Sequence, residues 1–372
     1  MYRQNRILID LAAIRHNYRL MQERVGHDVR VMAVVKANAY GHGLVEVAKT
    51  VEASGGHDLA VALVEEGIAL RDAGIRSEIL VLGAAMPNAV EAAVAYDLAM
   101  TVFEPSIIPT LERAAVLLGK PAKVHIKIDT GMNRIGLRTG EEAETLQAAL
   151  AMAPHVRVTG IYTHFADADH LTDAGEMSAY SRRQLALFRA LRAKFDPAIP
   201  AHTANSAMSL IAHEADFACV REGISLYGYP PVPTSLPFIP ALRWESEVVH
   251  VKDIQAGDCV GYGCTFTAPS AMRIATVAVG YGDGYHRLMS NRGQMLILGK
   301  RVNIVGRICM DQTMVDVSHV PEVSVGTKAI LIGSDGGDTI SAESLAKWAE
   351  TISYEVLLAI TPRVARVYLP AS

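Results

Sequence analysis

Short apolar runs alternate with longer amphipathic stretches between Val31 and Arg221. The stretches carry apolar residues at helical spacing, as Leu44–Ala53 and Leu185–Phe195 show. Eight strands separated by such helices predict an α/β fold, a (β/α)8 barrel of the TIM type. A doubly wound sheet is the alternative, but the chain lacks its dinucleotide-binding fingerprint. The eight expected strands are Val31–Lys36, Asp58–Ala62, Glu78–Gly83, Leu98–Phe103, Ala122–Ile128, Val156–Thr163, Ala201–Asn205 and Phe217–Arg221.

The pattern changes after a proline-rich connection that contains Tyr229–Pro233 and Pro237–Pro240. Beyond it the chain reads as mostly β, followed by a helix over Ser341–Glu350 with Ser341 as its N-cap. We therefore expect two domains, a barrel over residues 1–236 and a mostly β C-terminal domain over residues 237–372. The strands expected in the second domain are Leu242–Lys252, Arg273–Val279, Gln294–Leu298, Arg301–Ile308, Thr313–Val317 and Lys328–Ile332.

Composition and charge narrow the class of protein. The chain has 372 residues and a formal net charge of −4, with no basic stripe that would indicate nucleic-acid binding. Its apolar runs are too short to span a membrane, and residues 1–6 do not lead into a signal-peptide core. We expect a cytoplasmic protein without a metal site. Four cysteines lack CxxC spacing and fit reduced thiols better than a disulfide framework: Cys219, Cys259, Cys264 and Cys309.

Polar residues follow several of the predicted barrel strands. Functional groups of such barrels lie at the C-terminal ends of the strands, so these residues are expected on one rim. They are Lys36, the segment Asp129–Arg134, His164, the pair Asn205 and Ser206, and the segment Arg221–Ile224.

Lys36 ends a buried apolar run, where a lysine is hard to explain by packing. Desolvation lowers the pKa of a lysine, and its neutral amine can attack a carbonyl to form a Schiff base. Small residues and helix N-termini favour phosphate, so Tyr40, Ser206 and the amides near Gly223 and Ile224 are candidate phosphate ligands. A phosphate site beside an imine-forming lysine suggests pyridoxal 5′-phosphate.

Arg221 is the second informative residue. An arginine against the pyridine nitrogen of that cofactor cannot give up a proton, so the nitrogen stays unprotonated and the electron sink is weakened. Side reactions such as transamination should then be suppressed. Period-2 alternation places Arg221 and Glu222 on opposite faces of the strand, so only one of them can reach the ring. The sequence leaves open which one does.

These residues resemble the alanine racemase family, and the resemblance extends over essentially the whole chain. It implies a pyridoxal-phosphate-dependent barrel, a β-domain, and L-alanine and D-alanine as substrates. Its landmarks are Val34–Gly43, Lys127–Arg134, Tyr162–Phe165 and Arg221–Ile224, then Gly261–Gly263, Gly280–Gly284 and Gly306–Gln312.

The resemblance also implies roles for individual residues. Lys36 would carry the cofactor as an internal aldimine and act as base toward D-alanine once the substrate has formed the external aldimine. Tyr262 of the partner subunit would act as base toward L-alanine, hydrogen-bonded to His164, and Arg221 would contact the pyridine nitrogen. Other cofactor contacts would come from Tyr40, Arg134, Asn205, Ser206, Gly223, Ile224 and Tyr354, and substrate contacts from Arg134, Met310 and Tyr281, with Lys127 as a candidate for carbamylation.

Physical reasoning agrees with this two-base scheme. Racemisation removes a proton from one face of a carbanion and returns one to the other face, which requires two opposed groups. A tyrosine is a poor base unless cationic neighbours stabilise its phenolate, and a His164–Arg221 pair would supply them. A β-domain that supplies Tyr262 to a neighbouring barrel makes a homodimer with shared active sites the smallest complete unit.

Two alternative functions use the same cofactor. One is an amino-acid decarboxylase, which would prefer a carboxylate where Arg221 lies. The other is a non-catalytic protein that binds pyridoxal phosphate and maintains its supply, which would need neither a second domain nor an opposing tyrosine. The sequence does not decide whether an alanine racemase serves D-alanine biosynthesis for peptidoglycan precursors or D-alanine breakdown.

Overall fold

The computed structural model describes residues 3–370, which form two compact units. One unit contains the chain up to Ala12, Tyr40–His42, and the chain from Pro240 onward; the other contains Ala13–Ala39 and Gly43–Ile239. The predicted domain ranges 1–236 and 237–372 stay predictions. Their outermost residues, 1–2 and 371–372, lie outside the described residues.

The barrel unit contains an eight-stranded parallel sheet in the order β8-β7-β6-β5-β4-β3-β2-β9. Between its two end strands, Asn205 forms a parallel bridge with Arg221, and Arg221 N donates to Ala204 O over 3.0 Å. This closure confirms the predicted barrel, and each predicted barrel strand is present. The strands are β2 (Arg30–Val34), β3 (Asp58–Val61), β4 (Glu78–Ala84), β5 (Ala99–Val102), β6 (Ala122–Lys127), β7 (Val156–Tyr162), β8 (Ala201–His202) and β9 (Cys219–Glu222).

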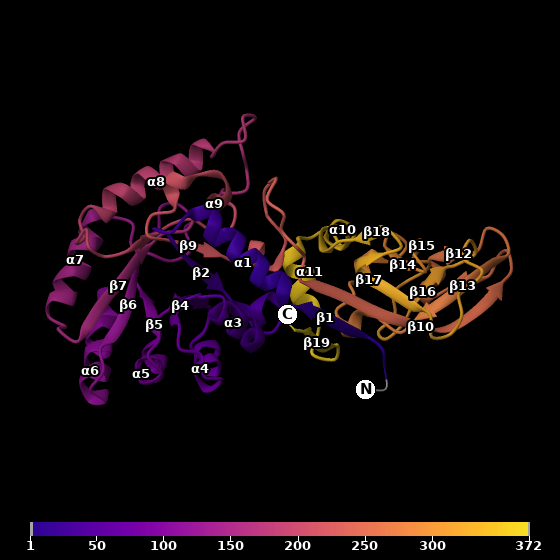
Figure 1. Ribbon diagram of the computed structural model, residues 1–372, viewed down its shortest axis with the longest axis horizontal. Helices are drawn as coiled ribbons and strands as arrows, with labels where there is room; N and C mark the ends of the chain where they lie inside the picture. The colour runs from indigo at the N-terminus through magenta and orange to yellow at the C-terminus, as the bar shows by residue number, and fades with distance from the viewer. Residues whose placement is uncertain (1–2, 371–372) are drawn as a thin grey trace. The chain divides into compact units, whose positions relative to one another are not determined.

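Helices lie around the outside of these strands (Figure 1). The predicted helix Leu44–Ala53 has the bounds of α3, whereas α8 begins at Ala179 rather than at Leu185. The earlier start has a local cause, because Ser178 Oγ accepts a hydrogen bond from Ser181 N and caps the helix. The helices are α1 (Leu11–Val25), α3 (Leu44–Ala53), α4 (Val64–Asp72), α5 (Val90–Ala95), α6 (Ile108–Leu118), α7 (Gly140–Ala151), α8 (Ala179–Arg192) and α9 (Met208–Ile211).

Directly after β2 the chain makes a turn of left-handed helix, α2 (Lys36–Tyr40). Ala37, Asn38, Ala39 and Tyr40 all have φ values between 52° and 54°. L-residues rarely adopt this conformation in succession, because it brings Cβ close to the following carbonyl oxygen. The turn is held by Ala39 N, which donates to Val35 O over 2.8 Å, and by Asn38. Asn38 accepts from Gly43 N through its carbonyl and from Leu44 N through its side chain, both over 2.9 Å.

The second unit is built on a nine-stranded sheet and two helices. Its strand β1 (Arg6–Asp10) was not expected from the sequence and pairs antiparallel with β10 and parallel with β19. The expected strand Arg301–Ile308 is too long, since β15 ends at Asn303 and Gly306 has a φ of 78°. The other strands are β10 (Leu242–Ile254), β13 (Met272–Val277), β14 (Gln294–Ile297), β15 (Lys300–Asn303), β16 (Thr313–Asp316), β17 (Lys328–Asp335), β18 (Asp338–Ile340) and β19 (Ala365–Leu369), beside the hairpin of β11 (Cys259–Val260) and β12 (Phe266–Thr267).

The helices of this unit are α10 (Ala342–Trp348) and α11 (Ser353–Ala359). Ser341 caps α10 as predicted, and its hydroxyl accepts from Ser344 N over 3.2 Å. Within residues 3–370, no helix is both long and apolar enough to cross a membrane.

Candidate active site

Arg221 occupies the interior of the barrel, where it is 3% exposed. Its Nη1 donates to His202 Nδ1 over 2.9 Å, and its Nη2 donates to His164 Nδ1 over 3.1 Å. Backbone carbonyls of the neighbouring strand ends also accept from the guanidinium, Thr163 O over 2.9 Å and Thr203 O over 3.0 Å. Burial lowers the pKa of Arg221 to about 10, so the group remains a cation at neutral pH.

His164 is neutral beside this cation. Burial, and then the charge of Arg221, lower the pKa of His164 well below its usual value. The positive charge of the predicted His164–Arg221 pair therefore belongs to Arg221. An arginine only donates, so His164 Nδ1 is the acceptor and Nε2 carries the ring proton.

Two further barrel side chains belong to this network and were missed in the sequence. His202 Nε2 lies 2.9 Å from His125 Nδ1, and the Tyr162 ring stacks on His202 with centroids 4.7 Å apart. The imidazole of His125 fits only because residue 160 is glycine, since a Cβ there would lie 2.4 Å from His125 Nδ1. Both histidines lie within predicted strands, whereas the candidate site residues were sought at the ends of strands. Sequence reasoning therefore passed over them.

Lys36 follows β2 at the start of the left-handed turn. Its pKa is lowered, first by burial and then by the positive charge of Arg134, with a smaller contribution from Arg221. Glu66 acts in the opposite direction, and its Oε1 accepts from Ala37 N over 2.5 Å. The predicted depression of the Lys36 pKa is confirmed in direction.

Lys127 and Arg134 come from β6 and the loop after it. Lys127 is 3% exposed, and its Nζ donates to Ile128 O over 2.8 Å. Burial and the charge of Arg221 lower the pKa of Lys127 to about 7. The loop is shaped by Asp129 Oδ1, which accepts from the backbone amides at positions 131 and 133 over 2.9 and 3.0 Å. Arg134 in this loop is exposed.

The predicted phosphate ligands Ser206 and Gly223 lie side by side. Ser206 Oγ accepts from Gly223 N over 2.8 Å and from Ser225 N over 3.5 Å, at the end of β9 where Ile224 follows. Asn205 instead uses its side chain to cap the next turn, since its Oδ1 accepts from Met208 N over 3.0 Å. The structure thus gathers backbone amides and a hydroxyl at one rim.

The alternation along β9 settles the geometry of Arg221 and Glu222. Arg221 lies with His164 and His202, whereas the Glu222 carboxylate accepts from Ser209 Oγ over 2.6 Å. Arg221 is therefore the residue that shares the barrel interior with the histidines.

Tyr40 and Tyr354 belong to the second unit, and their ring centroids lie 6.0 Å apart. Tyr262 is placed at the tip of the β11–β12 hairpin and is 70% exposed. The flanking Gly261 and Gly263 have φ values of 74° and 72°, which present the tyrosine on a tight turn. His164 belongs to the barrel unit, so its predicted hydrogen bond with Tyr262 stays a prediction.

The structure brings the two predicted substrate contacts Tyr281 and Met310 together. Tyr281 N donates to Cys309 O over 3.0 Å, and Gly282 N donates to Met310 O over 2.8 Å. The Tyr281 and Met310 side chains are 41% and 52% exposed, so both remain available to a ligand.

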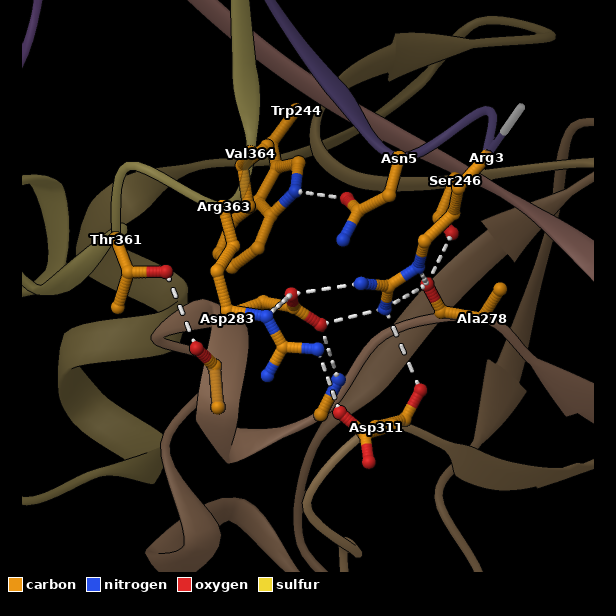
Figure 2. A network of polar contacts seen from close by, with 12 residues as sticks. Arg3, Asn5, Trp244, Ser246, Ala278, Asp283, Asp311, Thr361, Arg363 and Val364 are labelled. Atoms are coloured by element: carbon orange, nitrogen blue, oxygen red, sulfur yellow. Dashed lines mark hydrogen bonds and ion pairs between the residues drawn. The ribbon is translucent and has the colours of Figure 1, made fainter. Parts of the chain in front are cut away.

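A buried carboxylate fixes these two loops (Figure 2). Asp283 is fully buried and accepts from Arg3 Nη1 over 2.8 Å and from Arg3 Nη2 over 2.6 Å. Its Oδ2 also accepts from Gly280 N over 3.0 Å, which ties it to the loop that carries Tyr281. Arg363 lies 3.7 Å from Asp283 and donates to Asp311, the neighbour of Met310, over 2.7 Å. No local sequence pattern indicates this network, since Arg3, Asp283 and Arg363 are far apart along the chain.

Family models match both parts of the chain. Residues 9–231 match the N-terminal domain of alanine racemase, and residues 241–368 match its C-terminal domain. The chain belongs to the alanine racemase family. The alanine racemase of Symbiobacterium thermophilum is 44% identical over 97% of this chain and 96% of its own length. That of Listeria innocua is 41% identical over 99% of this chain and 98% of its own length.

Solved alanine racemases share the fold of the whole chain. The crystal structure from Bacillus anthracis, with bound L-Ala-P, has a TM-score of 0.90 and 38% identity, covering 100% of this chain and 96% of that one. The enzyme from the D-cycloserine producer Streptomyces lavendulae has a TM-score of 0.91 and 34% identity, covering 100% of this chain and 98% of that one. The alanine racemase family therefore accounts for both units and not only for the barrel.

Proposed function

We propose that the protein is an alanine racemase that interconverts L-alanine and D-alanine with pyridoxal 5′-phosphate. The observation that carries the proposal is the Arg221 guanidinium bonded to His164 inside the barrel, on the strand β9 that pairs with β2, the strand that Lys36 follows. Relatives named alanine racemase over nearly the full length support the substrate, as does the L-Ala-P bound to the Bacillus anthracis protein.

The residues present fit the cofactor. Lys36 has a lowered pKa, which leaves more of its amine neutral for bonding to an aldehyde. The Ser206 hydroxyl, which the Gly223 amide orients through a hydrogen bond, and the amide of Ile224 offer donors to a phosphate, with Tyr40, Tyr354 and Asn205 as the remaining candidates. Both terminal nitrogens of Arg221 are occupied, which leaves its Nε without an acceptor among the described residues and free for the ring nitrogen.

Bound pyridoxal phosphate supplies an electron sink that makes the α-proton of the amino acid acidic. The chain then has to place one base on each face of the α-carbon. Lys36 Nζ takes or returns the proton on the side of D-alanine, and Tyr262 Oη from a second copy of the chain does so on the side of L-alanine. His164 Nε2–H donates to the phenolate of that tyrosine, and the charge of Arg221 behind the neutral imidazole stabilises it.

Substrate orientation falls to three other residues. Arg134 and, from a second copy of the chain, the backbone amide of Met310 bind the substrate carboxylate, while Tyr281 of that second copy narrows the space for the side chain to about a methyl group. Lys127 is carbamylated when its neutral amine attacks carbon dioxide and releases a proton, and the resulting anion holds Arg134. A homodimer is then the smallest active unit, in the cytoplasm, where its D-alanine can supply peptidoglycan precursors.

Circular dichroism of L-alanine incubated with the purified protein tests the proposal. The alanine signal should decay to zero, and a visible absorption band of lysine-bound cofactor should disappear in Lys36→Ala. Release of carbon dioxide would instead indicate a decarboxylase. A visible band with an unchanged alanine signal would indicate a protein that only binds the cofactor.

A further inference from the structure

Glu66 lies in the first turn of α4, just after β3, and the proposed reaction gives it no role. Its Oε1 accepts from Ala37 N, the amide that follows Lys36, over 2.5 Å. Its Oε2 accepts from Ala62 N over 2.8 Å and from Leu63 N over 3.2 Å. One carboxylate therefore joins the start of α4 to the left-handed turn that begins at Lys36.

The turn α2 depends on contacts of this kind. Its residues from Ala37 to Tyr40 have left-handed backbone angles, which L-residues rarely hold in succession. The first N–H groups of a helical turn have no acceptor within the turn, and Ala37 N is one of them. A carboxylate satisfies such a donor with a charge-assisted hydrogen bond, which is stronger than a bond to a neutral acceptor. Glu66 therefore stabilises a backbone conformation that the residues of the turn disfavour.

The helix that carries Glu66 is held in place by packing. Residue 67 is glycine, and a Cβ there would lie 2.7 Å from Leu98 Cδ1, so α4 approaches Leu98 closely. Gly83 N donates to Ala62 O over 3.2 Å, which ties the segment before the helix to β4. The carboxylate is thus presented to Ala37 by a packed element of the barrel unit.

The charge of Glu66 also acts on Lys36. Burial lowers the pKa of Lys36, and the positive charges of Arg134 and Arg221 lower it further, whereas the negative charge of Glu66 raises it. The carboxylate therefore has two effects that experiments can separate. Its hydrogen bonds act on the backbone next to the lysine, and its charge acts on the ionisation of the amine.

We propose that Glu66 is a positioning residue for Lys36, and that its carboxylate holds the left-handed turn in the conformation from which the lysine amine meets the cofactor aldehyde. This inference rests on the proposed function, in which Lys36 bonds the cofactor. Bonding condenses the neutral amine with the aldehyde and releases water, so it depends on where the nitrogen lies and on whether it is ionised. Removing the hydrogen bonds of Glu66 changes the first, and removing its charge changes the second.

The visible absorption of the full-length protein titrated with pyridoxal 5′-phosphate, from about pH 6 to about pH 10, tests the proposal. In Glu66→Gln the amide oxygen can accept from only one side of the bridge, because the amide nitrogen only donates. At high pH, where the lysine is neutral in both proteins, the variant should bind the cofactor roughly tenfold more weakly, as when one hydrogen bond to a charged group is lost. Equal affinities of the variant and the wild type at high pH overturn the proposal.

The midpoint of the same pH profile reports the charge. It should move downward in Glu66→Gln, because the anion that raises the pKa of Lys36 is gone. Glu66→Asp keeps the charge but is one methylene shorter and cannot span the same three amides. It should weaken binding at high pH and keep the midpoint of the wild type. Full affinity in Glu66→Asp would count against the proposal.

Glu65→Gln is the matched control. Glu65 lies in the same first turn of α4 and is exposed, and its side chain forms no hydrogen bond within the described part of the chain. Its substitution removes the same charge from the same helix turn without touching the bridge. The affinity at high pH and the midpoint should therefore both stay at their wild-type values.

Hydrogen exchange of the same proteins without added cofactor tests the backbone part alone. Amides of Lys36–Tyr40 should exchange faster in Glu66→Gln than in the wild type and in Glu65→Gln, while peptides from α7 keep their wild-type rate. An unchanged rate over Lys36–Tyr40 overturns the proposal whether or not the protein racemises alanine. Racemisation is measured separately, so a failure of the proposed function is distinguished from a failure of this inference.

Discussion

Arg221 Nη2 donates to His164 Nδ1 over 3.1 Å, and this contact fixes both the charge and the tautomer of the histidine. Arginine has no acceptor atom, so the hydrogen bond has only one direction. His164 is therefore a neutral ring with its proton on Nε2. The cation that can stabilise a phenolate is Arg221, which lies behind His164 and keeps its proton at neutral pH.

Arg221→Lys should lower kcat for alanine racemisation by roughly 10², the usual cost of losing one preorganised donor. A lysine has a single nitrogen and cannot reach His164, His202 and a ring nitrogen in the planar arrangement of a guanidinium. Circular dichroism of alanine measures the rate. The exposed Arg189→Lys is the control, and a fully active Arg221→Lys would contradict this arrangement.

Gly160→Ala should destabilise the barrel by about 1–3 kcal/mol, the usual cost of overpacking. The added Cβ would lie 2.4 Å from His125 Nδ1, which must move and lose its contact with His202. Urea unfolding measures the change. Gly140→Ala is the control, because its Cβ would meet only the flexible end of Lys194. Equal stabilities of the two variants would argue against a tightly packed His125.

Lys127 should make stability depend on pH between about 7 and 10.5. Its pKa is about 7 in the folded protein against an ordinary 10.5, so the unfolded chain binds more protons in this window. The free energy of unfolding then rises with pH, with a slope approaching about 1.4 kcal/mol per pH unit. In buffers free of carbon dioxide, the wild type should show this rise relative to Lys127→Met.

Bicarbonate should have a second effect on Lys127. Carbamylation replaces a buried amine by an anion near Arg221 and Arg134, so bicarbonate should raise the Tm of the wild type by on the order of 2–4 °C. Chloride at matched ionic strength is the control for screening. The same rise in Lys127→Met would show that bicarbonate acts elsewhere.

Asp283→Asn should destabilise the protein by about 3 kcal/mol and raise KM for alanine. It leaves Arg3 and Arg363 without their buried partner and loosens the loops that carry Tyr281 and Met310. Asp311→Asn is the matched control, because that carboxylate is 57% exposed and its pair with Arg363 is worth at most about 1 kcal/mol. Chemical unfolding measures the change in stability, and steady-state kinetics measure KM. Equal effects of the two substitutions would contradict the prediction that Asp283 holds these loops in place.

Tyr262→Phe should impair the two directions of the reaction unequally. It removes the base proposed for L-alanine and leaves Lys36 in place. Exchange of the α-proton into deuterated water should therefore fall more for L-alanine than for D-alanine. Equal loss for both enantiomers would refute the two-base assignment.

The barrel was predictable because its strands are short apolar runs, and the residues at their C-terminal ends could be read directly. Lys36, His164 and Arg221 were found in this way. His125 and His202 were not, because they lie within strands and only their contact across the interior reveals them. The left-handed turn after β2 also gave no signal, since Ala37, Asn38 and Ala39 include no glycine.

Long-range pairings account for most of the rest. Arg3 and Asp283 are 280 residues apart in sequence, and no local pattern relates them. The strand Arg6–Asp10 was not expected because its partners, β10 and β19, lie far along the chain from it. Burial raises the pKa of Glu222 to about 7. The alternation of side chains along the strand placed Glu222 opposite Arg221, but it could not show how deeply the carboxyl is buried.

The pairing of β1 with β10 and β19 has a consequence for synthesis on the ribosome. The barrel unit is complete once Ile239 has emerged, whereas the first strand of the chain must wait for residues 365–369. Until then the edge of β1 that β19 covers presents unpaired backbone groups, even after β10 has emerged to pair with the other edge, and these groups are open to pairing with another nascent chain. A chain truncated before β19 should therefore retain a folded barrel but associate through its exposed N-terminal strand.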